Sequence, residues 1–254
     1  MTGPQPTTDV VDEALSQVDA LLHGLATDSK TGLTCRELRL ATGLSDEAVL
    51  ELTSRLMRYG LVDSDGTRFW LGIRLFELGG SAPLPRTLRE AAVPFVGDLY
   101  EATHETIHVG VLMGSDVLYI EKLRGHDPAH VATTVGARMP ASCTALGKAM
   151  LAFSTPDVVA AVVADGLQQR TPSSIVDPDH FAEELRRIAA TGVAYDREEN
   201  EVGVTCIAAP VLDRDVRPVG ALSITGPVER FDPALAVDAC RTAARGLSSA
   251  LFSM

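Results

Sequence analysis

The sequence predicts an α+β fold in two domains, and three observations support that prediction. Two helical patterns joined by a glycine turn lead into a hairpin signal between Leu33 and Leu71. A segment rich in glycine and proline, 79–85, then interrupts the chain. From Thr106 onward, runs that alternate with period two are interspersed with helical patterns, which is typical of an antiparallel sheet with flanking helices. We therefore expect an N-terminal winged helix-turn-helix domain followed by a larger antiparallel-sheet domain.

The composition is that of a globular chain without a membrane span. Hydrophobic residues make up 46% and charged residues 22% of the 254 residues, which is ordinary for such proteins. No apolar run approaches the roughly 18–20 residues that cross a bilayer, and the N-terminus lacks the basic and apolar regions of a signal peptide. Residues 1–8 are predicted to be a disordered tail. The four cysteines are widely separated, which favours reduced thiols in the cytoplasm.

The first domain is predicted over residues 9–80 and opens with an amphipathic helix over 10–25. Thr34 and Glu37 then form the T-x-x-E pattern of a capping box, in which the side chain of each residue bonds the backbone N–H of the other. Gly43 is suited to end the following helix in a left-handed conformation. Ser45 is a suitable cap for a second helix.

This second helix has one apolar face. Its apolar side chains recur at helical spacing, at Val49, Leu52, Leu56 and Tyr59. The spacing predicts a single buried stripe, and Gly60 is expected to stop the helix. Residues 61–63 and 67–71 flank the dipeptide Asp65-Gly66, which is a strong hairpin signal. A connecting helix is expected over 73–78, and the two glycines and two prolines of 79–85 place the domain boundary there.

The second domain is predicted over residues 81–254 and opens with a helix over 87–104. Strands are then expected over 106–113, 117–123, 130–135, 193–196, 204–213 and 216–225. Helices are expected over 144–153, 157–164, 179–190 and 234–252, and prolines at 156, 178 and 233 suit their first turns. Adjacent hairpins with helices before, between and after them indicate an antiparallel sheet covered by helices.

Several separated segments resemble one family. Residues 33–80, ending in L-G-I-R-L-F-E-L-G-G, are similar to the DNA-binding half of the IclR-type bacterial transcription regulators. In the second domain, V-G-A-R-M-P at 135–140 and T-A-L-G-K-A at 144–149 resemble the family's G-x-R-x-P and A-x-G-K-A-x-L-A segments. Residues 192–210 and 220–227 resemble its C-terminal signature. The resemblance extends from Asp9 onward, and it implies a sensor domain related to GAF and PAS modules and dimers that pair into tetramers.

The resemblance implies that the second helix of the first domain reads DNA in the major groove. The residues predicted to contact DNA are Arg36, Ser45, Asp46, Glu47, Leu50, Ser54, Arg55, Arg58 and Arg68. This helix departs from the family, because Asp46, Glu47 and Glu51 stand where relatives carry basic or hydroxyl side chains. Residues 1–80 also contain seven basic and twelve acidic residues, whereas DNA-binding domains normally present a basic face. An alternative prediction is therefore a ligand-sensing or scaffold protein of the same fold whose DNA binding is weak or lost.

By the same resemblance, a small-molecule pocket is expected in the second domain. Its predicted lining is Val131, Ala145, Leu146, Asp196, Val204, Cys206, Ser223 and Thr225. Ser223 and Thr225 alternate on one strand, so both hydroxyls are expected to face one side and to donate to an anion. The amides at the start of the helix over 144–153 attract a carboxylate, and Asp196 can accept from a ligand hydroxyl. The predicted effector is a small organic acid or a hydroxylated aromatic.

No catalytic residue, cofactor or metal site is predicted. Cys206 with one of the histidines at 104, 108, 126 and 130 suggests a thiol nucleophile, but no local nucleophile motif surrounds it, so a buried structural thiol is favoured. Cys143 and Cys206 lack the spacing of known zinc sites, and a glycine-rich phosphate loop is missing.

The sequence thus predicts a cytoplasmic, metabolite-responsive transcription regulator rather than an enzyme. Its expected partners are double-stranded operator DNA, a small-molecule effector and further copies of the chain, as a homodimer or a dimer of dimers, with no membrane partner. Two reading helices are expected about one DNA turn apart, roughly 34–36 Å. An effector that prefers one arrangement of the sensor domains shifts that spacing.

Overall fold

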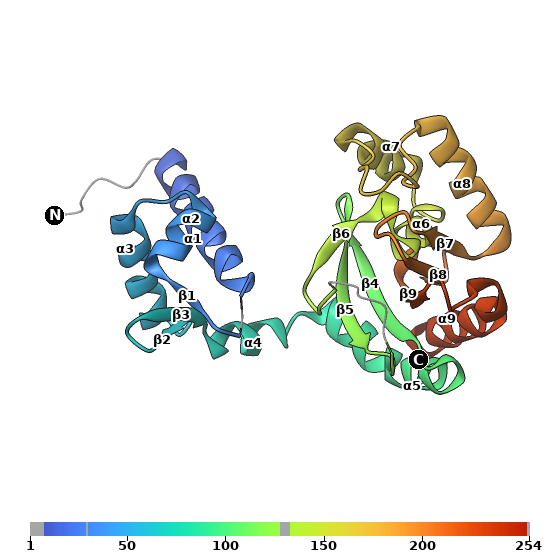
Figure 1. The fold of residues 1–254 in the computed structure, drawn as a ribbon, viewed down its shortest axis with the longest axis horizontal. Helices are drawn as coiled ribbons and strands as arrows, with labels where there is room; N and C mark the ends of the chain where they lie inside the picture. Colours follow the sequence, from blue (N-terminus) through green and yellow to red (C-terminus); the bar gives the residue numbers. More distant parts are fainter. Residues whose placement is uncertain (1–7, 29, 128–132, 253–254) are drawn as a thin grey trace. The chain divides into compact units, whose positions relative to one another are not determined.

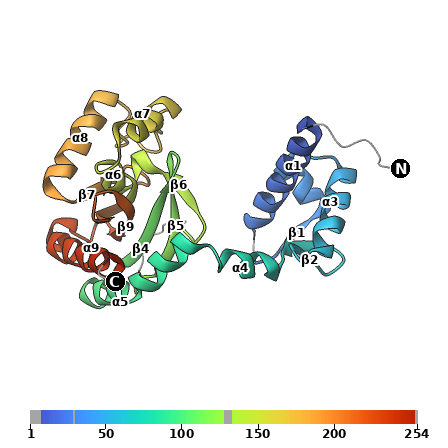
Figure 2. The ribbon, with the colours of Figure 1, turned by 180° about the vertical axis from the view of Figure 1, so that it is seen from behind.

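The computed structural model describes residues 8–28, 30–127 and 133–252. The chain divides into two compact units, Met1–Ala82 and Pro83–Met254, and Figures 1 and 2 show the elements within each unit from opposite sides. The predicted α+β class is confirmed by the two antiparallel sheets and their helices. Of the tail predicted over 1–8, all but Thr8 lies outside the described residues, and Thr8 begins the first helix. Within the described residues, no helix combines the length and apolar character needed to span a bilayer.

The N-terminal unit combines three packed helices with a small sheet. The helices are α1 (Thr8–Ala26), α2 (Cys35–Thr42) and α3 (Asp46–Arg58). The strands are β1 (Leu33–Thr34), β2 (Val62–Ser64) and β3 (Arg68–Leu71), in the order β1-β3-β2. Leu21, Leu38 and Val49, one from each helix, are fully buried in a shared core. The unit is therefore the predicted winged helix-turn-helix, with the short strand β1 added to the wing.

The caps of this unit form as the sequence predicts. The Thr34 Oγ1 accepts from the Glu37 backbone N–H at 3.3 Å, and the Glu37 Oε2 accepts from the Thr34 N–H at 2.8 Å, which completes the capping box. Gly43 ends α2 with φ 72°, in the left-handed region. The Ser45 Oγ accepts from the Ala48 N–H at 3.1 Å. These local bonds fix the turn between α2 and α3 and therefore the direction in which α3 leaves it.

The predicted buried stripe of α3 is wrong at its end. Tyr59 follows the helix and is 72% exposed, whereas Thr53 is buried. The Thr53 hydroxyl donates to the Val49 carbonyl at 2.7 Å, so its burial leaves no unpaired polar group. A polar residue that bonds its own helix can thus occupy a core position that an apolar pattern does not reveal.

The linker is shorter than the segment predicted over 79–85. Helix α4 (Ile73–Gly79) is followed by only Gly80, Ser81 and Ala82 before α5 (Pro83–Thr103) begins. Prolines in the first turn of a helix are tolerated because the N–H that they lack has no partner within the helix there. Pro94 lies inside α5 without ending it.

The C-terminal unit is built on one antiparallel sheet in the order β6-β5-β4-β9-β8-β7. The strands are β4 (Thr106–Met113), β5 (Asp116–Leu123), β6 (Arg138–Pro140), β7 (Ala194–Arg197), β8 (Val204–Leu212) and β9 (Pro218–Pro227). The strand predicted over 130–135 is wrong in its described part, because 133–135 form no strand. The chain instead turns at Gly136, with φ 89°, whose N–H bonds the Tyr119 carbonyl, and the strand begins only at Arg138.

Helices cover both faces of this sheet. On one face lie α5 and α9 (Val237–Phe252), packed on a core that includes Ile107, Leu222 and Ile224. The other face is covered by α6 (Ala145–Leu151), α7 (Pro156–Asp165) and α8 (Pro178–Thr191). Figure 1 shows these two groups of helices on either side of the strands. Because side chains alternate along a strand, the neighbours of the apolar residues on the first face point toward α6.

Candidate functional site

A small cavity lies between α6 and the sheet. It is lined by every predicted pocket residue that the structure describes, namely Ala145, Leu146, Asp196, Val204, Cys206, Ser223 and Thr225. Val131, the remaining predicted residue, lies outside the described residues. The structure adds His108, Tyr119, Thr144 and Asn200 to the lining. The cavity therefore gathers side chains from β4, β5, β7, β8, β9, the start of α6 and the turn after β7.

Strand register brings these residues together. His108 on β4 lies opposite Ser223 on β9, and Cys206 on β8 lies opposite Thr225 on β9. Ser223 and Thr225 line the same cavity, as their alternation predicts. His108 escaped the sequence reasoning as a lining residue. The signal that could have found it is its place in the period-two pattern of 106–113, between the apolar Ile107 and Val109.

A single chain of hydrogen bonds connects Lys122 to the polar side chains of the cavity. Lys122 Nζ donates to Thr133 Oγ1 at 3.0 Å, and Thr133 Oγ1 lies 2.9 Å from His108 Nε2. His108 Nδ1 lies 3.4 Å from Thr225 Oγ1, which donates to Cys206 Sγ at 3.2 Å. The chain ends at Asp196, whose Oδ2 accepts from Cys206 Sγ at 3.9 Å. The His108 imidazole therefore lies between two hydroxyls, with Nε2 facing Thr133 and Nδ1 facing Thr225.

This chain of bonds corrects one expectation about the site. Thr225 was predicted to donate to a ligand anion together with Ser223. Its hydroxyl hydrogen is directed instead to the Cys206 sulfur, and a hydroxyl has only one hydrogen to donate. The hydroxyl of Ser223, in contrast, takes no part in this series of hydrogen bonds.

Burial sets the protonation states in the cavity. Burial, reinforced by Glu199, raises the pKa of Asp196 from 3.8 to about 7. Burial, reinforced by Lys122, lowers the pKa of His108 from 6.5 to about 3. Burial and the neighbouring acidic groups also raise the pKa of the Cys206 thiol and of the Tyr119 phenol. At neutral pH the histidine, thiol and phenol are therefore neutral, and Asp196 is the one lining residue in the described part of the chain near its titration midpoint.

A buried ion cluster supports the cavity from behind. Lys148 on α6 is fully buried, and its Nζ lies 2.6 Å from each carboxylate oxygen of Glu199 and 3.5 Å from Glu184 Oε1. Glu184 also pairs with Arg187 on the same helix. Glu199 in turn donates its backbone N–H to Asp196 Oδ1 at 2.7 Å. The cluster thus joins α6 and α8 to the turn that holds Asp196.

The start of α6 packs too closely for a side chain. A Cβ added at Gly147 meets the Ala141 carbonyl oxygen at 2.2 Å, so glycine is required there. Thr144 caps the helix, with its Oγ1 accepting from the Gly147 N–H at 3.1 Å.

The helix that was predicted over 144–153 is shorter in the structure. The 3-10 turn η1 (Ala141–Cys143) precedes it, and α6 ends at Leu151.

Asn200 holds an unpartnered atom in the cavity wall. The residue is 8% exposed, and its Oδ1 is the one buried side-chain nitrogen or oxygen atom of the described residues without a hydrogen-bond partner. Asn200 lies on the turn after β7, and its own backbone N–H bonds Asp196 Oδ1 at 3.3 Å. A buried amide oxygen without a partner is costly to the fold, which makes it a site to explain.

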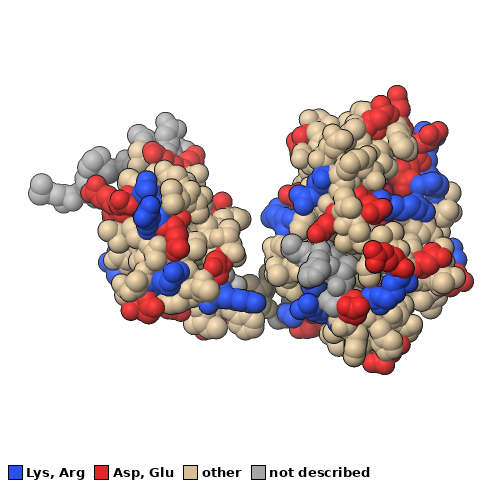
Figure 3. All heavy atoms as spheres, viewed as in Figure 1, with Lys and Arg blue, Asp and Glu red and all other residues tan. Residues whose placement is uncertain are grey.

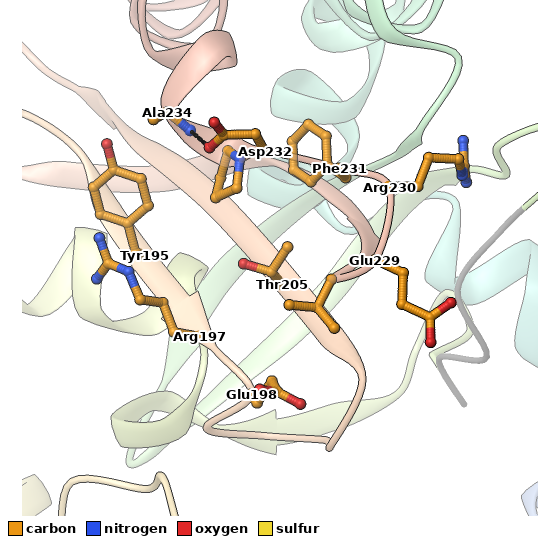
Figure 4. Close-up of a pocket in the computed structure, with 11 residues that line it drawn as sticks. Tyr195, Arg197, Glu198, Thr205, Glu229, Arg230, Phe231, Asp232 and Ala234 are labelled. Carbon is orange, nitrogen blue, oxygen red and sulfur yellow. Dashed lines mark hydrogen bonds between the residues drawn. The ribbon is translucent and has the colours of Figure 1, made fainter.

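The cavity is nearly closed in this conformation. The volume that the centre of a water molecule can occupy in it is ≈ 20 Å³, which is enough for about one water molecule. A larger hollow of ≈ 500 Å³ lies elsewhere on the unit, between the edge strand β7 and the 3-10 turn η2 (Pro233–Ala236). Figure 4 shows that hollow, where Arg197 stacks on Tyr195 and Asp232 bonds the Ala234 N–H. None of the predicted pocket residues that the structure describes lines it, so volume alone does not locate the predicted site.

The predicted DNA-reading side chains all belong to the N-terminal unit. Those that are exposed are Arg36, Ser45, Asp46, Glu47, Leu50, Ser54, Arg55 and Arg58. Arg68 is partly buried, because its guanidinium donates to the Gly32 carbonyl at 2.6 Å and pairs with Glu37 at 3.4 Å. That side chain therefore joins the wing to the start of α2.

Ion pairs within the unit offset part of the acidic charge of α3. Asp46 pairs with Arg39 at 3.3 Å, and Glu51 pairs with Arg55 at 2.5 Å. Among the described residues, Arg36 and Arg58 have no acidic partner. Figure 3 shows basic side chains of this unit standing among acidic ones on the face in view.

Comparison with known proteins places the chain. The model of the family "Bacterial transcriptional regulator IclR C-terminal" matches residues 85–249. The chain is 30% identical over 233 residues to the HTH-type transcriptional regulator XynR of Escherichia coli, with 90% of each chain covered. It is 33% identical over 222 residues to the Glycerol operon regulatory protein of Streptomyces coelicolor, with 86% of each covered.

A solved structure shares the fold. An IclR homolog from Microbacterium hydrocarbonoxydans, complexed with 4-hydroxybenzoate, matches with a TM-score of 0.85 at 23% identity, covering 94% of this chain and 98% of that one. Together with the family model and the two relatives, this confirms the resemblance found in the sequence. The chain belongs to the IclR family of bacterial transcription regulators.

Proposed function

We propose that this chain binds double-stranded operator DNA through α3 and that a small molecule in the cavity beside α6 controls this binding. The observation that best supports the first part is the capped turn between Thr42 and Asp46, which presents one whole side of α3 to solvent. Helices held in this way enter the major groove with their N-terminal residues toward the bases. Acting on DNA also implies a cytoplasmic location.

The exposed side of α3 divides into base-reading and phosphate-binding residues. Ser45, Leu50 and Ser54 are small or apolar enough to contact base edges, and Glu47 can accept from a cytosine amino group. Arg36 and Arg58 are free to contact phosphates, because no described acidic side chain pairs with them, and Arg55 has further N–H groups for a phosphate while it stays paired with Glu51. We propose that Asp46 stabilises the start of α3. Arg68 positions the wing close to the backbone of the DNA.

The alternative is a sensor or scaffold of the same fold with weak or lost DNA binding. Its support is the acidic character of α3, where Asp46, Glu47 and Glu51 stand together. Two of these carboxylates have arginine partners in the unit, so less negative charge faces the phosphates than the sequence suggests. DNA binding is therefore the better-supported function.

The closed cavity fits a regulatory rather than a passive site. A molecule larger than water enters only after the lining moves outward, so it binds the opened conformation and not the closed one. A ligand with such a preference shifts the equilibrium between the two conformations. The effector classes predicted from the sequence, a small organic acid or a hydroxylated aromatic, both require this opening.

We also propose that the chain acts as a homodimer or a dimer of dimers. Helix α4 carries three largely exposed apolar side chains, Ile73, Phe76 and Leu78, which are 67%, 77% and 52% exposed. Apolar side chains gathered on an exposed helix are typical of a surface that a partner covers. A second copy is the natural partner, because paired reading helices match the two half-sites of an operator.

Catalysis by Cys206 is not part of this proposal. A nucleophilic cysteine requires a depressed thiol pKa, whereas burial raises the pKa of Cys206 well above its usual range. Its hydrogen is directed to Asp196 rather than removed by His108, since Thr225 stands between the imidazole and the sulfur. Within the described residues, no group of three or more His, Cys, Asp or Glu is placed to hold a metal ion.

Binding to the DNA upstream of the chain's own gene tests the proposal. In a mobility-shift titration at low salt, the wild-type chain is expected to retard this fragment more strongly than a scrambled fragment of the same length. The Arg36→Ala, Arg58→Ala double variant is expected to lose most of that binding. Equal retardation of both fragments, or none of either, supports the alternative function.

A further inference from the structure

Three arginine side chains line one open hollow at the edge of the C-terminal sheet. The hollow has a volume of ≈ 340 Å³ and lies beside the edge strand β7, between α8 and α9. Its arginines come from three elements, Arg187 from α8, Arg197 from β7 and Arg241 from α9. Guanidinium groups gathered in one place repel one another unless anions neutralise them. The charge balance of these three side chains therefore decides what the hollow can hold.

Arg197 is the arginine whose N–H groups are least engaged. Its guanidinium carbon lies 4.2 Å from the centre of the Tyr195 ring, and Figure 4 shows this stack. Among the described residues, no hydrogen-bond acceptor or acidic group is bound to its side chain. Stacking on an aromatic face leaves the N–H groups at the rim of a guanidinium free. A carboxylate or a phosphate can therefore bond Arg197 through two parallel N–H groups.

The charge of Arg187 is already matched by a buried acid. Arg187 pairs with Glu184, whose side chain is 4% exposed and also lies 3.5 Å from the ammonium group of Lys148. Glu184 is the one acidic residue in the described lining of the hollow. Because a buried carboxylate cannot turn to water, this pair stays closed when a ligand arrives.

The partner of Arg241, in contrast, is exposed. Arg241 pairs at 2.6 Å with Asp238, whose side chain is 90% exposed, and donates to the Thr191 carbonyl at 3.4 Å. Exposed ion pairs contribute little to stability, so Asp238 can turn to water in favour of a ligand. Arg197 and Arg241 together therefore offer two positive charges to a bound molecule.

The floor of the hollow is apolar. Ile188 and Val193 are buried there, and Val237 and the ring of Tyr195 line the hollow beside them. An apolar floor with a few charged groups at its rim is typical of a small-ligand cleft, and clefts of this kind measure about 300–1,000 Å³. The hollow therefore has room for the carbon skeleton of a small organic molecule as well as for its charged groups.

The neighbouring hollow of ≈ 500 Å³ is less suited to an anion, although Arg197 lines both. Three carboxylates line it, those of Glu198, Glu229 and Asp232. Its other arginine, Arg230, pairs with Glu105 at 2.8 Å. An anion bonded to Arg197 is therefore favoured on the side of α8 and α9, where the second available arginine lies.

We propose that the hollow between α8, β7 and α9 is a second ligand site, which binds a small organic dianion, a dicarboxylate or a phosphomonoester, through Arg197 and Arg241. The two charges of the ligand match the two available guanidinium groups, and its carbon skeleton lies on the apolar floor. No described residue lines both this hollow and the cavity beside α6. The inference therefore does not depend on the proposed function.

Matched probes test the charge preference. Phenyl phosphate and adipate carry two negative charges at pH 8, whereas phenyl sulfate and hexanoate have nearly the same shape and carry one. Calorimetry on the full chain is done at low ionic strength, where exposed charges are least screened. The tighter of the two dianions is expected to bind at least five-fold more tightly than its matched monoanion. Which dianion is the tighter one tells a phosphomonoester site from a dicarboxylate site.

The Arg197→Gln variant tests the central arginine, with Arg217→Gln as its control. Both arginines are exposed and both variants lose one positive charge, but Arg217 lies in the turn before β9 and lines neither hollow. The affinity of Arg197→Gln for the tighter dianion is expected to fall at least ten-fold, because charge-assisted bonds are the strong ones. Arg241→Gln is expected to show a similar loss, whereas Arg217→Gln binds within two-fold of the wild type.

A further variant separates this site from the cavity beside α6. Ser223→Ala changes the lining of that cavity alone and is expected to bind the dianion like the wild type. If Ser223→Ala loses the dianion and Arg197→Gln keeps it, the dianion occupies the cavity and the inference is wrong. It is equally wrong if neither dianion binds with a Kd below about 10 mM, or if each monoanion binds as tightly as its dianion. The mobility shift judges the proposed function separately, so these failures leave that function intact.

Discussion

The reading side of α3 and the cavity beside α6 differ in how far the fold depends on them. The candidate DNA contacts on α3 come from one segment of 14 residues, 45–58, and are exposed, with few bonds to the rest of the unit. The cavity residues come from distant strands, are largely buried and bond one another. Substitutions on α3 can therefore change DNA recognition alone, whereas most substitutions at the cavity also change stability. An acidic α3 can therefore coexist with a cavity that retains the family's segments.

The largest effect is expected at the ion cluster behind the cavity. Lys148→Met leaves Glu199 and Glu184 buried without their shared cation, and removing one member of a buried ion pair costs about 3–5 kcal/mol. Urea unfolding of the C-terminal unit, followed by the fluorescence or exchange of its own residues, measures the loss. A loss below about 1 kcal/mol shows that the cluster is as solvated as a surface pair and removes the contrast with α3.

Opposed pH dependences are expected from the two titratable residues of the cavity. The raised pKa of Asp196 gives stability that is present below pH 3.8 and is lost as pH rises to about 7. The lowered pKa of His108 gives stability that is present above pH 6.5 and is lost as pH falls to about 3. Between these limits each residue contributes a slope of up to about 1.4 kcal/mol per pH unit, with opposite signs.

Single variants separate the two slopes. Relative to the wild type, the free energy of unfolding of Asp196→Asn is expected to rise from pH 5 to pH 6.5, because the His108 slope is no longer offset. That of His108→Gln is expected to fall over the same range. Denaturant titrations at half-unit pH intervals measure both, and parallel curves for all three proteins contradict the assignment of these pKa shifts.

A smaller effect is expected at the capping box of the N-terminal unit. Thr34→Ala removes the bond from the Glu37 N–H and is expected to cost about 1 kcal/mol. Hydrogen exchange of the α2 amides reports this local loss, with the exposed Thr67→Ala as control. Protection of α2 that is unchanged in Thr34→Ala makes the cap irrelevant to the orientation of α3.

The smallest effect on stability is expected at Arg58. Arg58→Ala removes an exposed side chain that has no acidic partner among the described residues, so stability is expected to change by less than about 0.5 kcal/mol. Operator affinity is expected to fall, and the slope of log K against log salt is expected to decrease by about 1. An unchanged salt slope shows that Arg58 does not contact phosphate.

The sequence predicts the N-terminal unit well because its signals are local. The capping box, the left-handed glycine at 43 and the Asp65-Gly66 turn each act within a few residues, and each forms as expected. The failures have physical causes. Thr53 can occupy the core because its hydroxyl bonds its own helix, and α5 can begin at Pro83 because first-turn prolines are tolerated.

The cavity was predictable only in part. Alternation places Ser223 and Thr225 on one side of β9, but no local pattern reveals that Thr225 is engaged by Cys206 and His108. The pairing of Lys148 with Glu199 joins residues 51 positions apart, and such long-range pairs leave no trace in periodicity. The unpartnered oxygen of Asn200 depends on the whole packed environment, so only a three-dimensional structure shows it.

The most direct test of the account measures DNA affinity with and without a ligand in the cavity. The Kd for the upstream fragment is determined by fluorescence anisotropy at fixed low salt, alone and with saturating 4-hydroxybenzoate, which is both a hydroxylated aromatic and an organic acid, for the wild type and for Ser223→Ala. The account predicts a change of about 5–150-fold for the wild type, the usual range of coupling between two sites, and a much smaller change for Ser223→Ala at the same ligand concentration. A wild-type Kd that stays within two-fold when calorimetry shows the ligand bound contradicts it.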